Sequence, residues 1–277
     1  ASLSLAGLDH YYRDFYDGLA QEHTETMFTL AGASYRGRAG MLRGVAEPKR
    51  WLDVGTGHGY FCLVAQEVWP ETRFDGLDLT PNVVEAERRG WVERGFHGLF
   101  PDLADELTGR YDVVSMHHYL EHTRDPAAEL DAAAAVLEDG GHLLVEVPAP
   151  ESALGRRLGW LWGPWLQPQH QHFVPEANLV AALERRGFRV LAAERGEVHQ
   201  PVDLGYAVML LANRLAPAAA SPWNPPPTLG RRLGRAATYA ALLPLAGIAV
   251  AADQVLVPVV RRRPQLSNAY RVLARKE

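Results

Sequence analysis

Short apolar runs alternate with segments of helical apolar spacing between about residues 50 and 197. This alternation is typical of βαβ units and predicts an α/β fold, a doubly wound and mostly parallel sheet. The apolar runs predict the strands Arg50–Val54, Arg73–Asp78, His97–Phe100, Tyr111–Met116, His142–Val147 and Phe188–Glu194. The intervening segments predict the helices Tyr60–Val68, Pro81–Arg89, Pro126–Leu137 and Pro175–Arg186. Alternating apolar positions in Asn268–Arg275 predict a last strand that returns to the sheet.

The chain divides into four predicted parts. Residues 1–49 are aromatic with a loose helical pattern, which predicts a helical N-terminal cap, and residues 50–198 form the predicted α/β core. Five prolines between positions 217 and 227 have the composition of a linker or rigid loop. Residues 199–267 are therefore predicted as a helical insertion or lid, and residues 268–277 as the last strand of the core sheet.

The predicted insertion contains an uncharged apolar run, Ala236–Ala252, with arginines before and after it. Pro244 and Gly247 interrupt the run, which is shorter than the roughly 20 residues that a membrane span requires. We expect a buried or lid helix here, with a membrane-surface or lipid-substrate contact as the alternative and a spanning helix least favoured.

Composition narrows the class of protein. A chain of 277 residues with 47% hydrophobic and 22% charged residues can bury a full core, which excludes a largely disordered protein. A net charge of −5 and a pI near 6.1 argue against a nucleic-acid partner. Cys62 is the only cysteine, so no internal disulfide can form, and we expect a buried structural thiol in a reducing compartment. The N-terminus lacks a basic-then-apolar signal pattern, and we expect a cytoplasmic protein.

A glycine-rich loop follows the first predicted strand, with the sequence Gly55, Thr56, Gly57, His58 and Gly59. Its missing side chains let the backbone turn sharply and approach a ligand at the following helix N-terminus. The Gly-x-Gly-x-Gly spacing differs from the nicotinamide fingerprint. Asp53, just inside the loop, would attract a cationic ligand and disfavour a pyrophosphate. The pattern favours S-adenosylmethionine (SAM), which carries an ammonium and a sulfonium; a tight turn without ligand is the alternative.

Asp78 ends the second predicted strand, beside the glycine loop. A carboxylate there can accept hydrogen bonds from the vicinal hydroxyls of a ribose, which indicates a nucleoside without saying which one. Capping of the next helix by Asp78 is the alternative, although Thr80 before Pro81 already fills the capping position.

The segment Met116–His122 is rich in titratable groups and lies at the end of the fourth predicted strand. Because an imidazole titrates near neutral pH, His117 or His118 can act as a general base toward a hydroxyl. Glu121 and His122 can instead hold the loop by hydrogen bonds. A metal held by His117, Glu121 and His122 is a weaker alternative, and no metal is expected.

The segment after the fifth strand, Pro148–Pro175, carries aromatic residues and histidines. Its tryptophans Trp160, Trp162 and Trp165 can be core residues or can wall an apolar substrate pocket. His170, which stands near His172, is a second candidate for a catalytic base or substrate ligand; a structural histidine is the alternative.

Taken together, the glycine loop and the segments Asp78–Pro81, Tyr111–Met116 and Leu120–Pro126 resemble class I SAM-dependent methyltransferases. The similarity is to the group related to the ubiquinone-biosynthesis O-methyltransferases, and it covers about Arg50–Arg195 and the last strand. It implies a seven-stranded sheet with an antiparallel last strand.

The resemblance also implies cofactor contacts. They are expected from Asp53, Gly55, Thr56, Gly57 and Gly59 at the methionine moiety, Asp78 at the ribose, Leu79, Phe100 and Asp102 at the adenine, Met116 and His117 at the methyl group, and Tyr12 from the N-terminal cap. Related ubiquinone-pathway enzymes have an acidic residue where His117 stands, and their Glu-His pair has been connected with a divalent metal. This sequence departs from that pattern at His117.

The expected activity is O-methylation of a small natural-product, sugar or lipid-like acceptor, with S-adenosylhomocysteine as the second product. Catalysis would consist chiefly of positioning for in-line transfer, with a histidine base. The acceptor class rests on family analogy alone. Alternatives are N- or C-methylation, a nicotinamide-dependent oxidoreductase, and a non-catalytic SAM-binding protein.

Overall fold

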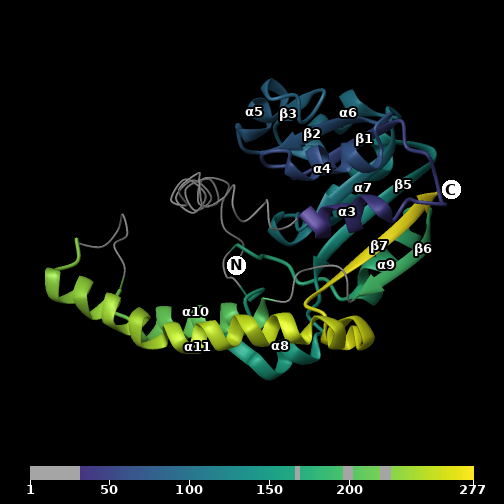
Figure 1. Ribbon diagram of the computed structural model, residues 1–277. Coiled ribbons are helices and arrows are strands. Elements are labelled where there is room, and N and C mark those ends of the chain that lie inside the picture. Colours follow the sequence, from purple (N-terminus) through teal and green to yellow (C-terminus); the bar gives the residue numbers. More distant parts are fainter. Residues whose placement is uncertain (1–31, 166–168, 196–201, 219–225) are drawn as a thin grey trace.

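A seven-stranded sheet organises the computed structural model, which describes residues 32–165, 169–195, 202–218 and 226–277 (Figure 1). The strands are β1 (Arg50–Val54), β2 (Arg73–Asp78), β3 (Gly95–His97), β4 (Tyr111–His117), β5 (Leu137–Pro148), β6 (Phe188–Arg195) and β7 (Ala269–Lys276). The α-helices are α3 (Gly32–Gly40), α4 (Tyr60–Val68), α5 (Asn82–Arg88), α6 (Phe100–Leu107), α7 (Pro126–Val136), α8 (Ala153–Leu158), α9 (Glu176–Glu184), α10 (Asp203–Leu215) and α11 (Leu229–Arg262). Three short 3₁₀ helices are η1 (Leu120–His122), η2 (Gly159–Leu161) and η3 (Pro264–Leu266).

The strand order β3-β2-β1-β4-β5-β7-β6 confirms the doubly wound fold. Every pair from β3 to β5 is parallel, whereas β7 runs antiparallel to both of its neighbours, β5 and β6. The direction of winding reverses between β1 and β4, which pair side by side. In open α/β sheets this switch point, at the carboxyl ends of the strands, is where ligands bind.

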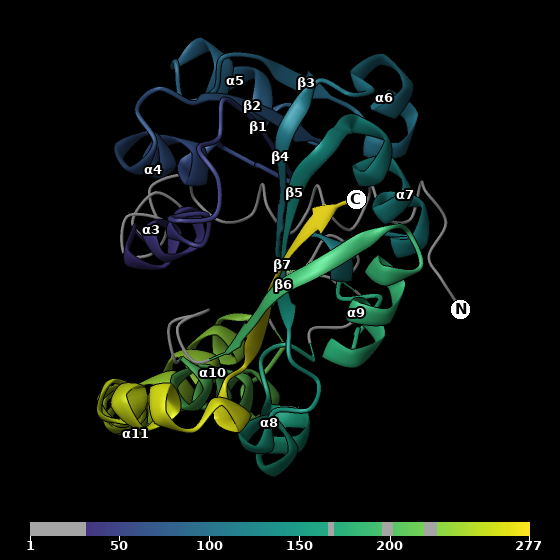
Figure 2. The ribbon, with the colours of Figure 1, turned by 90° about the vertical axis from the view of Figure 1, so that its right-hand side faces the viewer.

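Helices cover both faces of the sheet. Figure 2 shows α3, α4 and α5 on one face and α6, α7 and α9 on the other. Side chains alternate between the faces along each strand, so Trp51 packs with Phe61 and Phe74 under α4, while the next residue, Leu52, belongs to the opposite core layer. Cys62 is buried in the α4 layer, as expected.

The third strand differs from the prediction. It ends at His97, and Phe100 begins helix α6, so a strand over His97–Phe100 is wrong. The apolar character of Phe100 comes from its place in the core below a helix, and Pro101 fits the first turn of a helix because its nitrogen needs no intrahelical acceptor. A helix of only eight residues gives a weak periodic signal.

The segment between β6 and β7 forms an antiparallel helical hairpin, α10 and α11. Asp253 of α11 accepts hydrogen bonds from the backbone N–H groups of Leu204 (3.1 Å) and Gly205 (2.9 Å) at the start of α10. At the other end of α10, the Asn213 side chain accepts a hydrogen bond from Arg235 (2.8 Å). These contacts align the two helices along most of the length of α10.

Helix α11 continues through Pro244 and Gly247 for 34 residues, well beyond the apolar run Ala236–Ala252 from which a helix was expected. A proline removes one helical hydrogen bond and bends the helix but does not always end it. Within the described residues, α11 is the one helix long and apolar enough to cross a membrane; its best 18-residue window has a mean hydropathy of 1.9 and is 11% buried. This exposure contradicts a buried helix, whereas a role as a lid stays a prediction.

Candidate cofactor and active site

The glycine loop connects β1 to α4 and is fastened to the end of β2. The N–H groups of Gly55 and Thr56 donate to the carbonyl of Leu77 at 2.8 and 3.1 Å. Gly55, Gly57 and Gly59 have φ angles of 76°, 54° and 80°. Side chains are disfavoured in this left-handed region, so the three glycines are required by the backbone path of the loop.

Asp78 lies against this loop from the neighbouring strand. Its carboxylate accepts hydrogen bonds from the N–H of Gly57 (2.8 Å) and from the N–H and hydroxyl of Thr80 (both 2.7 Å). Thr80 therefore serves Asp78, and the expectation that it caps the next helix is wrong, because the α5 cap is Pro81 without a side-chain bond. A carboxylate has about four acceptor positions, so Asp78 retains capacity for a further hydroxyl.

The residues expected at the adenine have different exposures. Leu79 is 47% exposed beside Asp78, and its carbonyl accepts a hydrogen bond from His97 Nε2 at 3.0 Å. Asp102 is exposed in the first turn of α6. Phe100 is fully buried in the core, so Leu79 and Asp102 are accessible to a ligand and Phe100 is not.

Asp53 ends a chain of buried hydrogen bonds under the loop. Trp51 Nε1 donates to Ser115 Oγ at 2.8 Å, and this hydroxyl donates to Asp53 at 2.6 Å. Burial raises the pKa of Asp53 to about 6, although hydrogen bonds from Ser115 and Thr56 act in the opposite direction. A cationic ligand near Asp53 would favour its ionised form.

His117 lies at the end of β4 on the α3–α4 side of the sheet. Its ring meets Phe61 edge-on, with centroids 4.5 Å apart, and its two ring nitrogens are buried without a hydrogen-bond partner among the described residues. Burial, followed by the charges of Arg38 and Arg271, holds the pKa of His117 well below 6.5. His117 is therefore a neutral imidazole at neutral pH. Met116, the residue before it, is fully buried in the opposite core layer.

His118 has the opposite electrostatic character. It adopts a positive φ of 51°, and its ring nitrogens lie 3.1 Å from Glu121 Oε1 and 2.9 Å from Glu146 Oε1. Burial lowers the pKa of His118, but the two carboxylates outweigh it and raise the pKa to about 9. The imidazolium predominates at neutral pH, which disfavours His118 as a general base.

Glu146 is the centre of a buried ion cluster that the sequence analysis missed. The carboxylate pairs with Arg38 of α3 at 2.5 Å, Arg271 of β7 at 3.0 Å and His118 at 2.9 Å. Despite burial, these cations hold the pKa of Glu146 well below its usual range. The signal in the sequence was a glutamate within the apolar stretch Leu143–Val147 of β5.

Glu121, His122 and His170 form a second cluster, whose potential ligand atoms lie within 4.8 Å of one another. His170 Nδ1 lies 2.7 Å from the carbonyl of Pro164, and His122 Nδ1 lies 3.2 Å from that of Gln169. Because a carbonyl only accepts, each Nδ1 carries the proton, and Nε2 is the basic nitrogen of each neutral ring.

One carboxylate and two imidazoles suit a transition metal, so Glu121, His122 and His170 fit such an ion by donor chemistry. His117, which the weighed metal site included, is not a member of this group. Burial lowers the pKa of His170, and it lowers that of His122 to about 4. Both rings are therefore neutral at neutral pH.

The tryptophans of the long loop have separate roles. Trp162 is buried and donates from Nε1 to Asp203 Oδ1 at 2.9 Å, so it is a core residue that fixes α10. Trp165 is 40% exposed, and its ring contacts that of Phe173 at a tilt of 57°, with centroids 4.4 Å apart. Trp160 is 62% exposed. Tyr12, expected at the cofactor, lies outside the described residues.

Tyr119 is a further site residue that the sequence analysis missed. A Cβ atom placed on Gly55 would lie 2.5 Å from the Tyr119 ring, so the ring rests directly on the loop backbone. The Tyr119 hydroxyl donates to Glu129 at 2.9 Å, which holds the ring in this place. Tyr119 follows His117 and His118 in a segment without helix or strand periodicity, so the sequence did not indicate that its ring lies on the loop.

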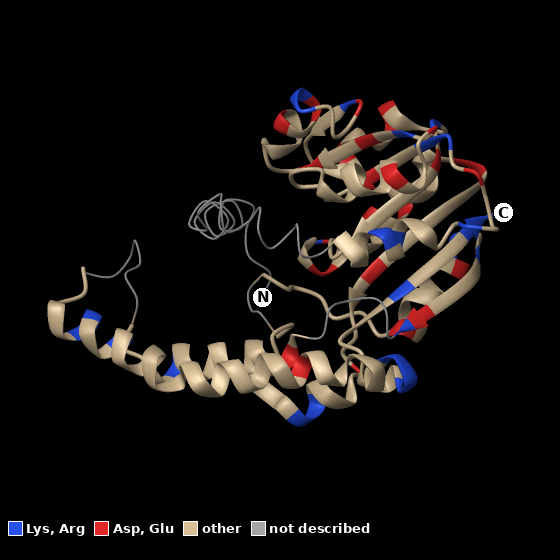
Figure 3. Ribbon diagram, in the orientation of Figure 1, with Lys and Arg blue, Asp and Glu red and all other residues tan. Residues whose placement is uncertain are grey.

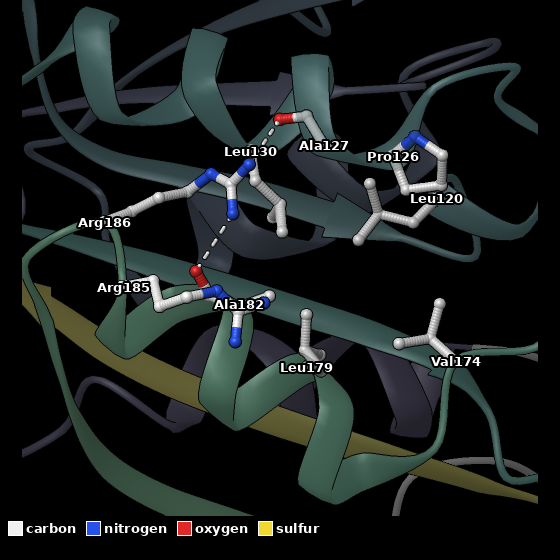
Figure 4. Close-up of a pocket in the computed structure, with 9 residues that line it drawn as sticks. All are labelled: Leu120, Pro126, Ala127, Leu130, Val174, Leu179, Ala182, Arg185 and Arg186. Carbon is white, nitrogen blue, oxygen red and sulfur yellow. Dashed lines mark hydrogen bonds between the residues drawn. The ribbon is translucent and has the colours of Figure 1, made fainter.

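A cavity of about 250 Å³ lies between α7 and α9 (Figure 4). Leu130, Val174 and Leu179 contribute apolar side chains to it, and Arg186 crosses its edge with hydrogen bonds to the carbonyls of Ala127 and Ala182. None of the expected cofactor residues lines this cavity.

Comparisons with known proteins agree with this arrangement. A family described as "Methyltransferase domain" matches residues 33–193. Ubiquinone biosynthesis O-methyltransferase from Bordetella avium is 27% identical over 178 residues, covering 60% of this chain and 73% of the relative. The enzyme of that name from Bordetella bronchiseptica is 30% identical over 181 residues, covering 61% and 72%.

Solved structures share the fold. A SAM-dependent methyltransferase from Archaeoglobus fulgidus aligns with a TM-score of 0.53 at 18% identity, covering 88% of this chain and 94% of that one. An O-methyltransferase family protein from Burkholderia thailandensis has a TM-score of 0.51 at 16% identity, covering 66% and 59%. The chain belongs to the methyltransferase-domain family and is a SAM-dependent methyltransferase.

Proposed function

We propose that this methyltransferase transfers the methyl group of SAM to a hydroxyl oxygen of a small acceptor, with a histidine as the general base. The observation that carries the proposal is the neutral imidazole of His170, whose segment is hydrogen-bonded to the η1 turn that directly follows β4. The names of the curated relatives support oxygen as the acceptor atom. The acceptor is a small natural-product, sugar or lipid-like molecule.

Two carboxylates and the glycine loop would make most of the contacts with SAM. Asp78 would accept from the ribose hydroxyls, as it now accepts from Thr80, and the loop from Gly55 to Gly59 would lie against the methionine moiety. Asp53, with its pKa near 6, would be held ionised by the ammonium of SAM. Leu79 would cover the adenine from its exposed position.

His170 is the better placed of the two candidate bases. The bond to Pro164 makes Nδ1 the donor of the neutral ring, so Nε2 is its basic nitrogen. The ring nitrogens of His117 are buried, so an acceptor reaches them only after a rearrangement. The segment of His170 is fastened to the end of β4, because Gln171 N–H donates to the Glu121 carbonyl at 2.7 Å.

A base is needed because the acceptor hydroxyl must lose its proton when its oxygen is methylated. SAM supplies an electrophilic methyl group whose sulfonium becomes a neutral thioether. His170 would accept the hydroxyl proton of the acceptor as its oxygen takes the methyl group, with SAM leaving as the thioether. The chain's main contribution is to hold the oxygen and the methyl group in line at near-attack distance.

Cofactor binding is tested first, because it needs no acceptor. Calorimetry should show binding of SAM and S-adenosylhomocysteine, weak or absent binding of NADH, and weaker SAM binding by Asp78→Ala. Tighter binding of NADH than of SAM, or an unchanged SAM affinity in Asp78→Ala, would contradict the assigned cofactor site.

The base is tested with a panel of hydroxylated aromatic, sugar and lipid-like acceptors at saturating SAM. His170→Ala should lower kcat by about a hundredfold to ten-thousandfold and leave SAM affinity unchanged. His172→Ala, two positions away, is the matched control and should retain turnover. If His170→Ala and His117→Ala both keep turnover within about threefold of wild type, positioning alone carries the reaction.

A further inference from the structure

Helix α11 has two different faces. The stripe that contacts α10 holds its polar side chains, among them Tyr239 and Asp253. On the opposite face, every exposed position from Ala236 to Val259 is apolar or glycine, except Gln254. Its largest side chains include Leu243, Ile248 and Val255, which are 69%, 67% and 75% exposed. Scattered apolar side chains are ordinary on a surface, but a continuous face of this length indicates a binding surface.

Arginines stand at both ends of the apolar face. Figure 3 shows blue toward the two ends of α11 and a mostly tan stretch between them, with a red patch in the second half of the helix. Residues 202–263 contain seven arginines and two aspartates, a net charge of +5 in a chain whose formal net charge is −5. Both aspartates are buried in hydrogen bonds, Asp203 with Trp162 and Asp253 with the start of α10. The hairpin therefore presents only positive charge at its surface.

We propose that this face of α11 docks on an anionic lipid bilayer, with the helix lying in the plane of the membrane surface. An apolar face flanked by arginines has the properties of helices that rest at the headgroup boundary. The apolar side chains enter the boundary region, and the guanidinium groups at both ends contact lipid phosphates. This proposal is independent of the acceptor assigned above.

Charge decides between a bilayer and a second copy of the chain. Pairing two α11 faces would bring two hairpins of net charge +5 together, whereas an anionic surface complements that charge. The bilayer also accommodates a face without polar groups, because lipid needs no hydrogen bonds from it.

Packing within the hairpin decides between lying on the bilayer and spanning it. Asp253, in the middle of the second half of α11, holds the start of α10, and Arg235 holds its end through Asn213. A spanning orientation would carry α10 and these polar contacts into hydrocarbon, where polar groups are costly. With 13 residues, about 20 Å, α10 is too short to cross alongside α11.

Vesicle flotation of the full chain tests the proposal. Wild type should float with vesicles of phosphatidylcholine and phosphatidylglycerol, float less with phosphatidylcholine alone, and be released by high salt. The double variant Ile248→Glu/Val255→Glu should lower binding at least about tenfold, because two large apolar side chains lose their burial. Val84→Glu on α5, 53% exposed in wild type, is the matched control and should float as wild type does.

A second variant separates charge from apolar contact. Arg231→Gln/Arg232→Gln should reduce the preference for phosphatidylglycerol while leaving the fold, followed by circular dichroism, unchanged. Wild type that does not float with either vesicle, or an α11 double variant that floats as well as wild type, overturns the proposal.

Two further outcomes identify a different occupant or depth. A dimer in analytical ultracentrifugation without lipid, converted to a monomer by Ile248→Glu/Val255→Glu, would assign the face to a second copy of the chain. Retention in vesicles after alkaline carbonate extraction would show that α11 spans the bilayer. Either result refutes docking in the plane of the surface.

Discussion

Replacing Glu146 by Gln removes the negative charge at the centre of the buried ion cluster while keeping the side-chain volume. The wild-type carboxylate is fully buried and faces Arg38, Arg271 and His118 at 2.5–3.0 Å. The variant leaves these cationic groups buried without their shared counter-ion. Breaking a buried pair in this way costs about 3–5 kcal/mol, since the remaining charge is not compensated. We expect a loss of that size in the free energy of unfolding.

The assay is urea unfolding of wild type, Glu146→Gln and a surface control, Glu67→Gln. Glu67 pairs with Arg36 at 2.7 Å, but both side chains are more than half exposed, so the control should lose less than about 1 kcal/mol. An NMR titration should also show that the pKa of His118, about 9 in wild type, falls in Glu146→Gln. If Glu146→Gln loses no more stability than Glu67→Gln, the cluster does not stabilise the fold and the reasoning fails.

Three further predictions concern pH and the loop. The pKa of His118 is raised from 6.5 to about 9, so the stability that the protonated ring gives the fold is complete below pH 6.5 and is lost as pH rises through 9. Between these pH values the free energy of unfolding of wild type should fall by about 2–3 kcal/mol relative to His118→Gln, as measured by urea unfolding. Burial raises the pKa of Asp53 from 3.8 to about 6, so its ionisation costs stability above pH 6; Asp53→Asn should gain about 1–2 kcal/mol at pH 8 without ligand and bind SAM more weakly in calorimetry. Gly55→Ala should lower the free energy of unfolding by about 1–3 kcal/mol, because the alanine is strained at a positive φ and its Cβ clashes with the Tyr119 ring. Adding Tyr119→Ala should remove the clash and recover only that part of the loss, since φ stays positive. Full recovery in urea unfolding would show that φ is not the cause.

Local patterns were enough to place much of the sheet. The first strand, Arg50–Val54, and the helix Tyr60–Val68 have their predicted bounds, because an apolar run, three glycines and a helical period follow one another without competing signals. Helix α6 was missed because its eight residues begin with an apolar residue after a short strand. The full length of α11 was not predicted, because the apolar run is shorter than the helix, which extends through the flanking arginines at both ends.

Part of the candidate site was also predictable from the sequence, and part was not. Asp78 and the glycine loop meet because they follow adjacent strands, and this was predictable from the order of elements. The partners of Glu146 were not predictable, since Arg38 and Arg271 lie 108 and 125 positions away along the chain. A charge in the buried part of a strand indicates that a partner exists, but only the three-dimensional fold selects which one.

The place of β7 in the sheet also constrains the order in which the protein can fold. β6 pairs only with β7, and in the pair of Arg195 with Tyr270 the two residues are separated by the whole α10–α11 hairpin. Until β7 has inserted, β6 has no neighbour in the sheet and β5 has an open edge. Closing a long loop costs little additional entropy, but contacts distant in sequence form slowly. The edge of the sheet beyond β5 therefore assembles late and as a unit, after the hairpin that carries the apolar face has been synthesised.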